Sequence, residues 1–596
     1  MEQSNIRNFA IIAHIDHGKS TLADRIMELT QTVSQRESKS QLLDDMEVER
    51  AHQVTVKSRT VQNKYRAKDG KVYELNLIDT PGHVDFSYEV SRSLSASDGV
   101  ILLVDATQGV QAQTVANYRL AKKLDLPILP VLNKIDSPNA DIERTTKQLQ
   151  KLEPSFKTVK PLMISAKTGK NIPELLEALV NFIPAPNGKK VAPLKALVFD
   201  VKYDQYQGVV AMVRVFEGQL TSDKDLLLMA KQVSFKAGEI GIFSPEMEAV
   251  RTLATGEVGY VITGSKDIND IRVGDTLTAK VHPAENSLPG YRPIKPMVYM
   301  GIYPRNSEYK DLKLALEKLA LNDPALYYAE ETSDTLGPGF RGGFLGMFHL
   351  QIIRERLKEE YGIDILTTSP NVSYRVHLKD QIIKTIDNPV DFPYFNDIVQ
   401  VDEPFVMAQI TVPSENVGDV LKLTSQYRGK LLDMNNEAEL VVLDFKMPLA
   451  KVAYDFFNQL KSITHGYATL DIEFLDHEPS DVVKVVLDIN YAAVDALAFI
   501  IHRSEAYQVA QELVKKLKYT LPRRLYPTAV QALVEGKVIA RVDVPPLRKN
   551  AAVNGEKRSI SKKQALLRNQ KHNKAKAKNS HVRLPQAVFD SLLEVQ

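Results

Sequence analysis

The chain has 596 residues, of which 44% are hydrophobic and 25% are charged, and it contains no cysteine. A chain of this length exceeds what one hydrophobic core supports, so we expect several domains. Without cysteine, disulfides and thiolate metal sites are excluded, and no apolar run reaches the ~20 residues of a membrane span. The first residues, Met-Glu-Gln-Ser-Asn, show no charged region followed by an apolar one. We therefore predict no signal peptide and a cytoplasmic location.

The net charge of +2 hides a strongly basic tail. Twelve of the 76 Lys and Arg residues lie between Arg548 and Arg583, where Glu556 is the only acid, so this tail carries +11 and the remainder −9. Such a block is typical of a segment that binds a polyanion, with nucleic acid the first candidate and an anionic membrane surface the second. The plainer interpretation is a solvated tail without a partner.

Strand-like and helical patterns alternate from Asn8 to about Pro184. Strands are predicted at 8–14, 72–78, 99–104, 127–132 and 161–165, and helices at 22–29, 86–97, 112–124, 139–151 and 172–183. This alternation predicts a doubly wound α/β domain with a mostly parallel sheet. Ligands bind such sheets at the carboxyl ends of the strands, and each motif below follows a predicted strand.

The first motif, from Ala13 to Thr21, reads Ala-His-Ile-Asp-His-Gly-Lys-Ser-Thr and joins a strand to a helix, as a phosphate-binding P-loop does. Ala13 stands where the first glycine of this motif is usual. The loop N–H groups and the helix N-terminus supply partial positive charge to phosphate oxygens. Lys19 adds a full charge, and the Ser20 hydroxyl suits Mg²⁺. The predicted phosphate-binding residues are Asp16, His17, Gly18, Lys19, Ser20 and Thr21.

The second motif, from Asp79 to His83, reads Asp-Thr-Pro-Gly-His and follows the strand predicted at 72–78. A carboxylate that faces a P-loop can hold Mg²⁺ through water, so Asp79 is a predicted metal residue. Gly82 can donate its N–H to a γ-phosphate, and His83 is placed to orient the attacking water. Alone, this sequence would indicate an ordinary β-turn. Together with a P-loop, it indicates hydrolysis of a nucleotide.

The third motif, from Asn133 to Asp136, reads Asn-Lys-Ile-Asp. The Asp136 carboxylate can accept hydrogen bonds from guanine N1–H and the exocyclic amine, donors that adenine lacks, so the motif favours GTP over ATP. Asn133 is expected to tie this loop to the P-loop, and the Lys134 stem to cover the base. After a further strand, the N–H of Ala166 could reach guanine O6. The predicted guanine-binding residues are Asn133, Lys134, Ile135, Asp136, Ser165, Ala166 and Lys167.

The stretch 44–60 is polar and lacks a clear period, which is typical of a switch. Thr55 is the candidate to bind Mg²⁺ and to sense the γ-phosphate. The predicted metal residues are therefore Ser20, Thr55 and Asp79. The implied cofactors are GTP and Mg²⁺.

These motifs together resemble the translational GTPases, the ribosome-activated relatives of elongation factors Tu and G. The resemblance implies that His83 positions the hydrolytic water once the ribosome docks, with Lys19 as the second catalytic residue. In that family the first switch reads Glu-Arg-Glu-Arg-Gly-Ile-Thr-Ile, whereas this chain has His52 and Gln53 in place of the second Arg and the Gly. This departure suggests a divergent member or a second copy.

The rest of the chain resembles the later domains of these factors. After a Pro-rich linker at 184–188, strands and Gly turns predict a β-barrel. The stretch from Phe340 to Leu350 resembles the third domain of elongation factor G; we assign no chemistry to His349. A transitional segment at about 378–402 leads to a split βαβ pattern. We predict two ferredoxin-like α/β domains among five domains: a GTP-binding domain at 1–186, a β-barrel domain II at 189–283, an α/β domain III at 291–378, a domain like domain V of elongation factor G at 400–478, and a mixed α/β C-terminal domain with the basic tail at 481–596.

The tip domain of elongation factor G is missing, and the ending Pro585-Gln586-Ala587-Val588-Phe589 resembles that of the elongation factor 4 (LepA) family. This resemblance implies a ribosome-dependent GTPase that moves tRNA back by one codon on stalled or mistranslocated ribosomes. The implied partners are rRNA and tRNA, contacted through domains II, III and V and the tail. The protein is expected to be a monomer in the cytoplasm, with peripheral association at the cytoplasmic face of the membrane as an addition.

Two alternatives remain. One is a ribosome-assembly or stress GTPase of the BipA type, because the Phe-Arg-Gly-Gly stretch is shared widely, although the ending argues against it. The other is an RNA- or membrane-binding protein whose nucleotide site is only structural, which the altered switch favours.

Overall fold

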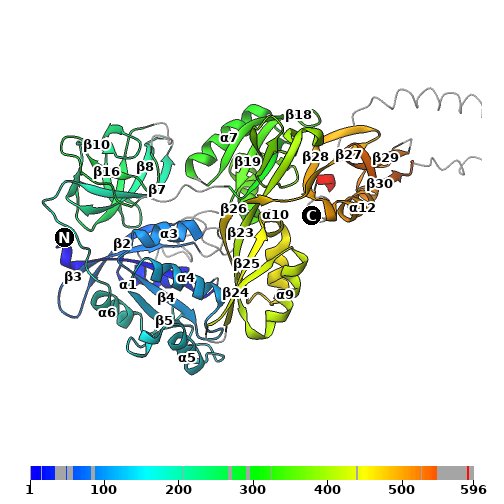
Figure 1. The fold of residues 1–596 in the computed structure, drawn as a ribbon. Helices are drawn as coiled ribbons and strands as arrows, with labels where there is room; N and C mark the ends of the chain where they lie inside the picture. Colours follow the sequence, from blue (N-terminus) through cyan, green and yellow to red (C-terminus); the bar gives the residue numbers. More distant parts are fainter. Residues whose placement is uncertain are drawn as a thin grey trace, which may run out of the picture.

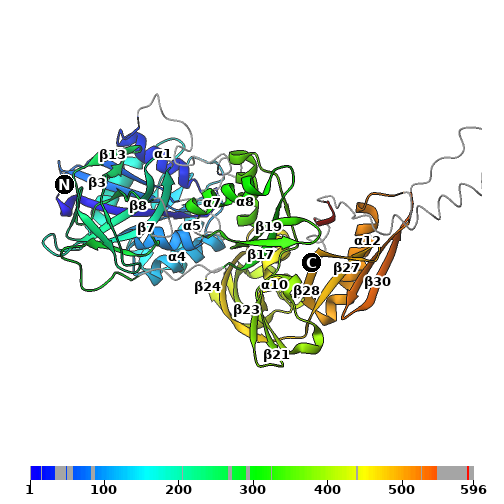
Figure 2. The ribbon, with the colours of Figure 1, turned by 90° about the horizontal axis from the view of Figure 1, so that it is seen from above.

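In the computed structural model, sheet-containing units follow one another along an elongated molecule (Figure 1). The structure describes residues 2–14, 16–33, 49, 58–81, 87–204, 206–265, 271–289, 296–323, 325–437, 440–524, 527–546 and 587–589. The first sheet and the barrel lie at one end and the C-terminal sheet at the other in both ribbon views (Figure 1, Figure 2). This confirms the predicted multidomain α/β fold class.

The first sheet has the strand order β2-β3-β1-β4-β5-β6, and β2 alone runs antiparallel to its neighbour. Its strands are β1 (Ile6–Ala13), β2 (Thr60–Arg66), β3 (Val72–Asp79), β4 (Gly99–Asp105), β5 (Ile128–Asn133) and β6 (Leu162–Met163). Its helices are α1 (Lys19–Leu29), α3 (Ser87–Ser95), α4 (Ala112–Lys123), α5 (Ile142–Leu152) and α6 (Ile172–Phe182). The sequence pattern missed β2, whose outer half is exposed and charged.

All eight residues of β1 are buried because helices cover both faces of the sheet. Phe9 and Ile11 belong to a core shared with α1 and α6. Ala10 and Ile12 belong to a second core shared with α3, α4 and α5. Alternate side chains of β1 are thus packed into two cores, so the P-loop begins at the end of a rigid strand.

The barrel is an antiparallel sheet with the strand order β11-β10-β16-β7-β8-β15-β12-β13, and β9 pairs with β14. Its strands are β7 (Lys195–Asp204), β8 (Gly208–Glu217), β9 (Gln219–Thr221), β10 (Asp225–Leu228), β11 (Val233–Lys236), β12 (Ile240–Phe243), β13 (Met247–Val250), β14 (Thr252–Ala254), β15 (Val258–Ile262) and β16 (Thr276–Ala279). The Asn8 amide donates to the carbonyl of Gly256 at 2.9 Å, and Arg214 pairs with Asp98. These contacts attach the barrel to the first sheet.

The third unit has the order β18-β19-β17-β20, which is the ferredoxin-like arrangement of a split βαβ pattern. Its elements are β17 (Val298–Pro304), α7 (Tyr309–Asn322), β18 (Tyr327–Ser333), β19 (Gly337–Phe344), α8 (Met347–Tyr361) and β20 (Ile365–Thr367). His349 on α8 is buried: its Nε2 lies 3.0 Å from Oδ2 of Asp323, and its Nδ1 accepts from the N–H of Leu345 at 3.2 Å. Both ring nitrogens of His349 therefore have hydrogen-bond partners within the fold, which is a structural role.

The fourth unit repeats this arrangement around the long strand β23, with β26 and β25 on its two sides and β24 beyond β25. Its elements are β23 (Ile398–Pro413), α9 (Val417–Gln426), β24 (Lys430–Glu437), β25 (Leu440–Pro448), α10 (Leu449–Lys451), a π-helical turn (Val452–Phe456), α11 (Phe457–Ile463) and β26 (Thr469–Pro479). Part of the segment at 378–402, expected as a transition, belongs to this sheet. It contains the end of β21 (Tyr374–Leu378), β22 (Ile383–Ile386) and the start of β23.

The C-terminal unit has the order β28-β27-β29-β30 with one helix against it. Its elements are β27 (Val482–Ile489), β28 (Ala492–His502), α12 (Arg503–Thr520), β29 (Thr528–Val534) and β30 (Lys537–Val544). Val588 and Phe589 are buried in its core, so the chain returns to this sheet after the basic tail. The whole of that tail, from Arg548 to Arg583, lies outside the described residues.

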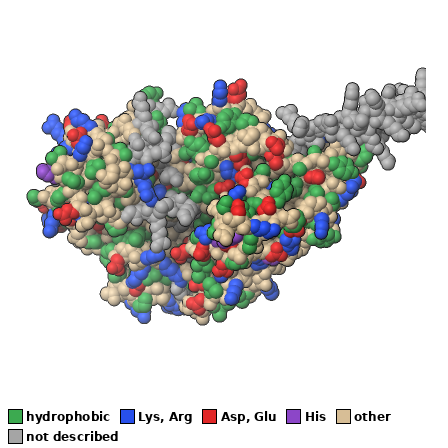
Figure 3. Space-filling model, turned by 45° about the horizontal axis from the view of Figure 1, so that its top comes forward, with side chains coloured by type: hydrophobic (Ala, Val, Ile, Leu, Met, Phe, Trp, Pro, Cys, Tyr) green, Lys and Arg blue, Asp and Glu red, His purple; other side chains and the backbone are tan. Residues whose placement is uncertain are grey.

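The described surface carries both signs of charge. On the face drawn in Figure 3, Lys and Arg side chains are interspersed with Asp and Glu. Among the described residues no helix is long and apolar enough to cross a membrane.

Candidate functional site

The motif loops meet at one edge of the first sheet. Strands β3, β1, β4 and β5 are parallel neighbours, so their carboxyl ends lie at the same edge. The P-loop follows β1, while Asp79, Asp105 and Asn133 end the other three strands. This edge is where a doubly wound sheet binds its ligand.

The turn into α1 requires glycine at position 18. Gly18 has a φ of +94°, and a Cβ there would lie 2.4 Å from Nδ2 of Asn133. Gly18 is also the N-cap of α1, whose first residues are Lys19, Ser20 and Thr21. The N-terminal N–H groups of α1 are therefore at the edge where phosphate oxygens are expected.

Lys19 and Asp79 form a buried ion pair at the phosphate end of the site. Nζ of Lys19 lies 2.8 Å from Oδ1 of Asp79, and the two side chains are 9% and 0% exposed. The register of β1 against β3 places Ile11 opposite Asp79, and the Thr80 hydroxyl donates to the Ile11 carbonyl at 2.7 Å. The Asp79 carboxylate and the Ser20 hydroxyl are hard oxygen donors, which fit Mg²⁺.

Three predicted residues lie outside the described residues: Thr55, Gly82 and His83. Their predicted roles in metal binding, phosphate sensing and water placement stay predictions. The chain is described again from Ser87, where α3 begins.

Asn133 joins three loops at the base end of the site. Its Nδ2 donates to the carbonyl of His17 at 2.8 Å, and its Oδ1 accepts from the N–H of Ala166 at 2.9 Å. Nε of Arg25 on α1 donates to the Ala166 carbonyl at 3.0 Å. The N–H that we expected to reach guanine O6 is therefore bonded to Asn133, and it would have to exchange this partner to contact the base.

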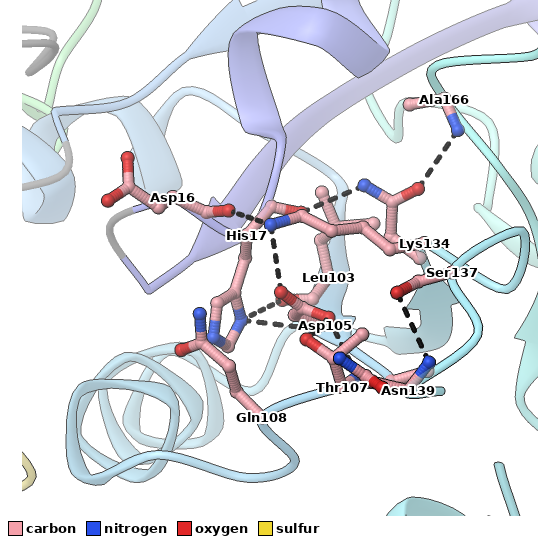
Figure 4. A network of polar contacts seen from close by, with 12 residues as sticks. Asp16, His17, Leu103, Asp105, Thr107, Gln108, Lys134, Ser137, Asn139 and Ala166 are labelled. Atoms are coloured by element: carbon pink, nitrogen blue, oxygen red, sulfur yellow. Dashed lines mark hydrogen bonds and ion pairs between the residues drawn. The ribbon is translucent and has the colours of Figure 1, made fainter. Parts of the chain in front are cut away.

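Lys134 connects the base loop to the P-loop (Figure 4). Its Nζ donates to the carbonyl of Asp16 at 2.6 Å and lies 2.8 Å from Oδ2 of Asp105. Oδ1 of Asp105 accepts from both the N–H and the hydroxyl of Thr107 at 2.7 Å. Burial by itself raises the pKa of Asp105, but the hydrogen bonds from Lys134 and Thr107 hold it below its ordinary value.

His17 is buried at the centre of this network. Its Nδ1 lies 3.2 Å from the backbone nitrogen of Asp105, whose N–H donates to it, and 3.4 Å from the carbonyl oxygen of Leu103. Burial lowers the pKa of His17 to about 3 because a desolvated imidazolium is unfavourable. The ring is therefore neutral at physiological pH and acts as a hydrogen-bond acceptor.

Asp136 is exposed at the end of the base loop. The Ser165 hydroxyl donates to its carboxylate, which lowers the pKa of Asp136. The N–H of Ile135 donates to the carbonyl of Ile164 at 3.3 Å, so the loop is tied to the chain that leads to Ser165. An ionised, partly solvated carboxylate of this kind suits recognition of guanine N1–H and its amine. Lys167 lies next to it and is exposed.

The sequence interpretation missed Asp105, Thr107 and Arg25. A signal for Asp105 was present, since an acidic residue directly follows the strand predicted at 99–104 and all other motifs occupy that position. No sequence pattern identifies Thr107 or Arg25, because each acts through a contact with a distant segment.

Known families match most of the chain. Residues 4–185 match "Elongation factor Tu GTP binding domain" and residues 208–278 match "Elongation factor Tu domain 2". Residues 400–486 match "Elongation factor G C-terminus" and residues 489–594 match "GTP-binding protein LepA C-terminus".

Relatives that match over the full length of the chain are named as elongation factor 4 proteins. The chain is 58% identical over 595 residues to "Elongation factor 4 2" of Lactiplantibacillus plantarum, with 100% of each chain covered. It is 47% identical to "Elongation factor 4" of Bacillus subtilis, covering 100% of this chain and 97% of the relative. It is 46% identical to "Elongation factor 4" of Aquifex aeolicus, with both chains fully covered. A solved structure from Thermus thermophilus has a TM-score of 0.59 at 19% identity and covers 80% of this chain and 97% of its own, a likeness of fold alone.

Proposed function

The chain belongs to the elongation factor 4 (LepA) family of translational GTPases, and on this premise we propose that it binds GTP with Mg²⁺, docks on the ribosome and leaves after hydrolysis. It is a ribosome-dependent GTPase that takes part in translation. The observation that carries the proposed site is the junction at Asn133, which ties the P-loop and the Ala166 loop together at one sheet edge.

We propose distinct roles for the two ends of the site. Asp136 recognises the guanine edge, and Lys134 covers the base with its stem. At the other end Lys19 stabilises negative charge on the phosphates, and His83 orients the attacking water. Bound Mg²⁺ would neutralise phosphate charge, held by Ser20, Asp79 and Thr55.

The Lys19–Asp79 ion pair supports this assignment of the phosphate end. A buried lysine without a counter-charge is strongly unfavourable, and here Asp79 supplies that charge at 2.8 Å. When a nucleotide binds, its phosphates replace Asp79 as the partner of Lys19. The released carboxylate then becomes available to the metal.

A ribosome-binding assay tests this proposal directly. Purified protein is expected to discriminate GTP from ATP, to show faster GTP turnover with ribosomes than without, and to cofractionate with ribosomes in the presence of a non-hydrolysable GTP analogue but not GDP. Turnover that ribosomes do not change, or equal ribosome binding with both guanine forms, would contradict it. A protein with a structural nucleotide site, the alternative considered above, would give that result.

We propose the domain boundaries given above: 1–186, 189–283, 291–378, 400–478 and 481–596. Support comes from the stretches matched by known families. The sheet of the fourth unit begins earlier than the proposed bound, because β21, β22 and the start of β23 belong to it. Within the described residues, the chain from β20 to β23 forms only β21, β22 and two short 3₁₀ turns. The described part of that connection therefore contains no tip domain.

We propose that the partners are rRNA and tRNA, contacted through the barrel, the two ferredoxin-like units and the basic tail, and that the movement is a one-codon return of tRNA. Toeprinting on post-translocation ribosomes tests the direction, with a signal that shifts back by one codon as the expected result. A forward shift or no shift contradicts it. The matched LepA C-terminus argues against the BipA alternative.

We further propose that this is a second, divergent copy acting as a monomer in the cytoplasm. Its first switch carries His52 and Gln53, and the relative at 58% identity is named "Elongation factor 4 2". Peripheral membrane association rests on the +11 tail alone. Flotation with anionic vesicles, before and after ribosomal RNA is added, shows which of the two polyanions the tail prefers. RNA is expected to displace the protein from the vesicles.

A further inference from the structure

Asp105 is a buried carboxylate beside the proposed nucleotide site, and it belongs to none of the nucleotide-binding motifs. It ends β4 and is 0% exposed. One oxygen accepts two hydrogen bonds from Thr107, and the other lies 2.8 Å from Nζ of Lys134. Thr107 therefore orients the Asp105 carboxylate through one oxygen, independently of the contact that Lys134 makes with the other oxygen.

Lys134 connects the base loop to the P-loop, and each loop contains a residue with unfavourable backbone geometry. Lys134 and Asp16 have φ values of 61° and 62°, in the left-handed region that costs about 1 kcal/mol for residues other than glycine. The Lys134 ammonium bonds the Asp16 carbonyl at 2.6 Å and Asp105 on its other side. Because the ammonium has two fixed partners, the side-chain stem that leads to it is held over the base position.

Asp105 also contacts the P-loop through its backbone. Its N–H donates to Nδ1 of His17 at 3.2 Å. One residue thus holds the base loop with its side chain and the P-loop with its N–H (Figure 4). None of these contacts involves Lys19 or Asp79 at the phosphate end.

We propose that Asp105 is a positioning residue that sets the affinity for guanine nucleotides by holding Lys134 over the base. The inference rests on the proposed guanine site and deepens it. Because Asp105 acts at the base end, it contributes equally to GDP and GTP binding. It does not contribute to the hydrolysis step.

The substitution Asp105→Asn isolates this role. An amide offers one acceptor oxygen and one donor group, so it cannot accept from Thr107 and Lys134 at the same time. In the full-length protein, we expect the dissociation rate of a fluorescently labelled GDP to rise about tenfold, as for loss of one charge-assisted hydrogen bond. The Kd for GTP and the KM are expected to rise by the same factor, with an unchanged ribosome-stimulated kcat.

A matched control lies at the other end of the same strand. Asp98 directly precedes β4 and pairs with Arg214 of the barrel. Asp98→Asn removes an ion-paired carboxylate of the same strand without touching the base loop, so nucleotide affinity is expected to stay at the wild-type value. If both variants weaken binding equally, damage to β4 explains the result and the inference is overturned.

Two further variants keep the inference testable. Thr107→Val removes one hydrogen bond that orients Asp105, and we expect GDP dissociation to rise about threefold; this variant replaces Asp105→Asn if the latter does not fold. Asp136→Asn reports on the proposed site itself. If Asp136→Asn abolishes guanine preference while neither Asp105→Asn nor Thr107→Val changes dissociation, the inference about Asp105 is wrong. If Asp136→Asn has no effect, the proposed guanine site is wrong.

Discussion

At the guanine end of the proposed site, Asn133 and Lys134 are already bonded to the P-loop, whereas at the phosphate end Lys19 is bonded to Asp79. The first set of contacts can persist when a nucleotide binds, apart from the N–H of Ala166. In the proposed mechanism the ion pair separates, because the phosphates bind Lys19 and Asp79 becomes available to the metal. The proposed base end is thus largely preorganised by contacts already present, whereas the proposed phosphate end requires Lys19 and Asp79 to exchange partners.

The largest effect is expected at the phosphate end, from His83→Ala. Loss of the residue that we propose to orient the water should lower ribosome-stimulated kcat about 1,000-fold, in the range of general acid–base effects. GDP affinity should be unchanged because the base end is intact. Single-turnover hydrolysis on ribosomes measures the first quantity and GDP titration the second. Wild-type turnover in this variant would remove His83 from the mechanism.

The next effect is expected at the base end, from Asp136→Asn. Guanine preference should fall about 100-fold, because the amide cannot accept both guanine donors. Binding of xanthosine triphosphate should improve, since its C2 carbonyl accepts from the new amide. Competition between the two nucleotides measures this change. Asp141→Asn, at the exposed N-cap of α5 five residues on, is the control and should keep the preference for guanine.

A smaller effect is expected from Asp79→Asn, which weakens the proposed metal end and the Lys19 pair together. The Mg²⁺ concentration needed for half-maximal GTP binding should rise about tenfold. Glu74→Gln is the control, because Glu74 is a buried carboxyl on the same strand β3, away from the loops. An unchanged Mg²⁺ midpoint in Asp79→Asn would exclude Asp79 as a metal residue.

The smallest effect concerns pH and the neutral ring of His17. In the folded protein its pKa is about 3, against an ordinary value of 6.5. As the pH falls, His17 therefore becomes protonated in the unfolded chain before it does in the folded protein. The free energy of unfolding then decreases below pH 6.5, by at most about 1.4 kcal/mol per pH unit. Urea unfolding at pH 7.5 and 5.5 measures the loss. His17→Asn should reduce it, whereas replacing the exposed His282 with Gln should not.

The local patterns predicted the elements of the first sheet well where both faces are buried. Strands such as β4 read as continuous apolar runs, so they were recognised within one or two residues. The edge strand β2 was missed because it mixes polar and apolar residues. Strand β22, within the segment at 378–402, was not predicted for a related reason: it is mostly exposed and only its pairing with β21 makes it a strand.

The amino-acid sequence alone determined the alternating α/β pattern and the family, and it supplied the candidate residues of the motifs, because spacing and residue type suffice for these. Only the tertiary structure decided that Asp105 meets Lys134, that Lys19 is paired with Asp79, and that Ala166 bonds Asn133. Each of these contacts joins segments far apart in the chain. Parallel strands bring their ends together in space, and no local pattern records which neighbours will share a hydrogen bond.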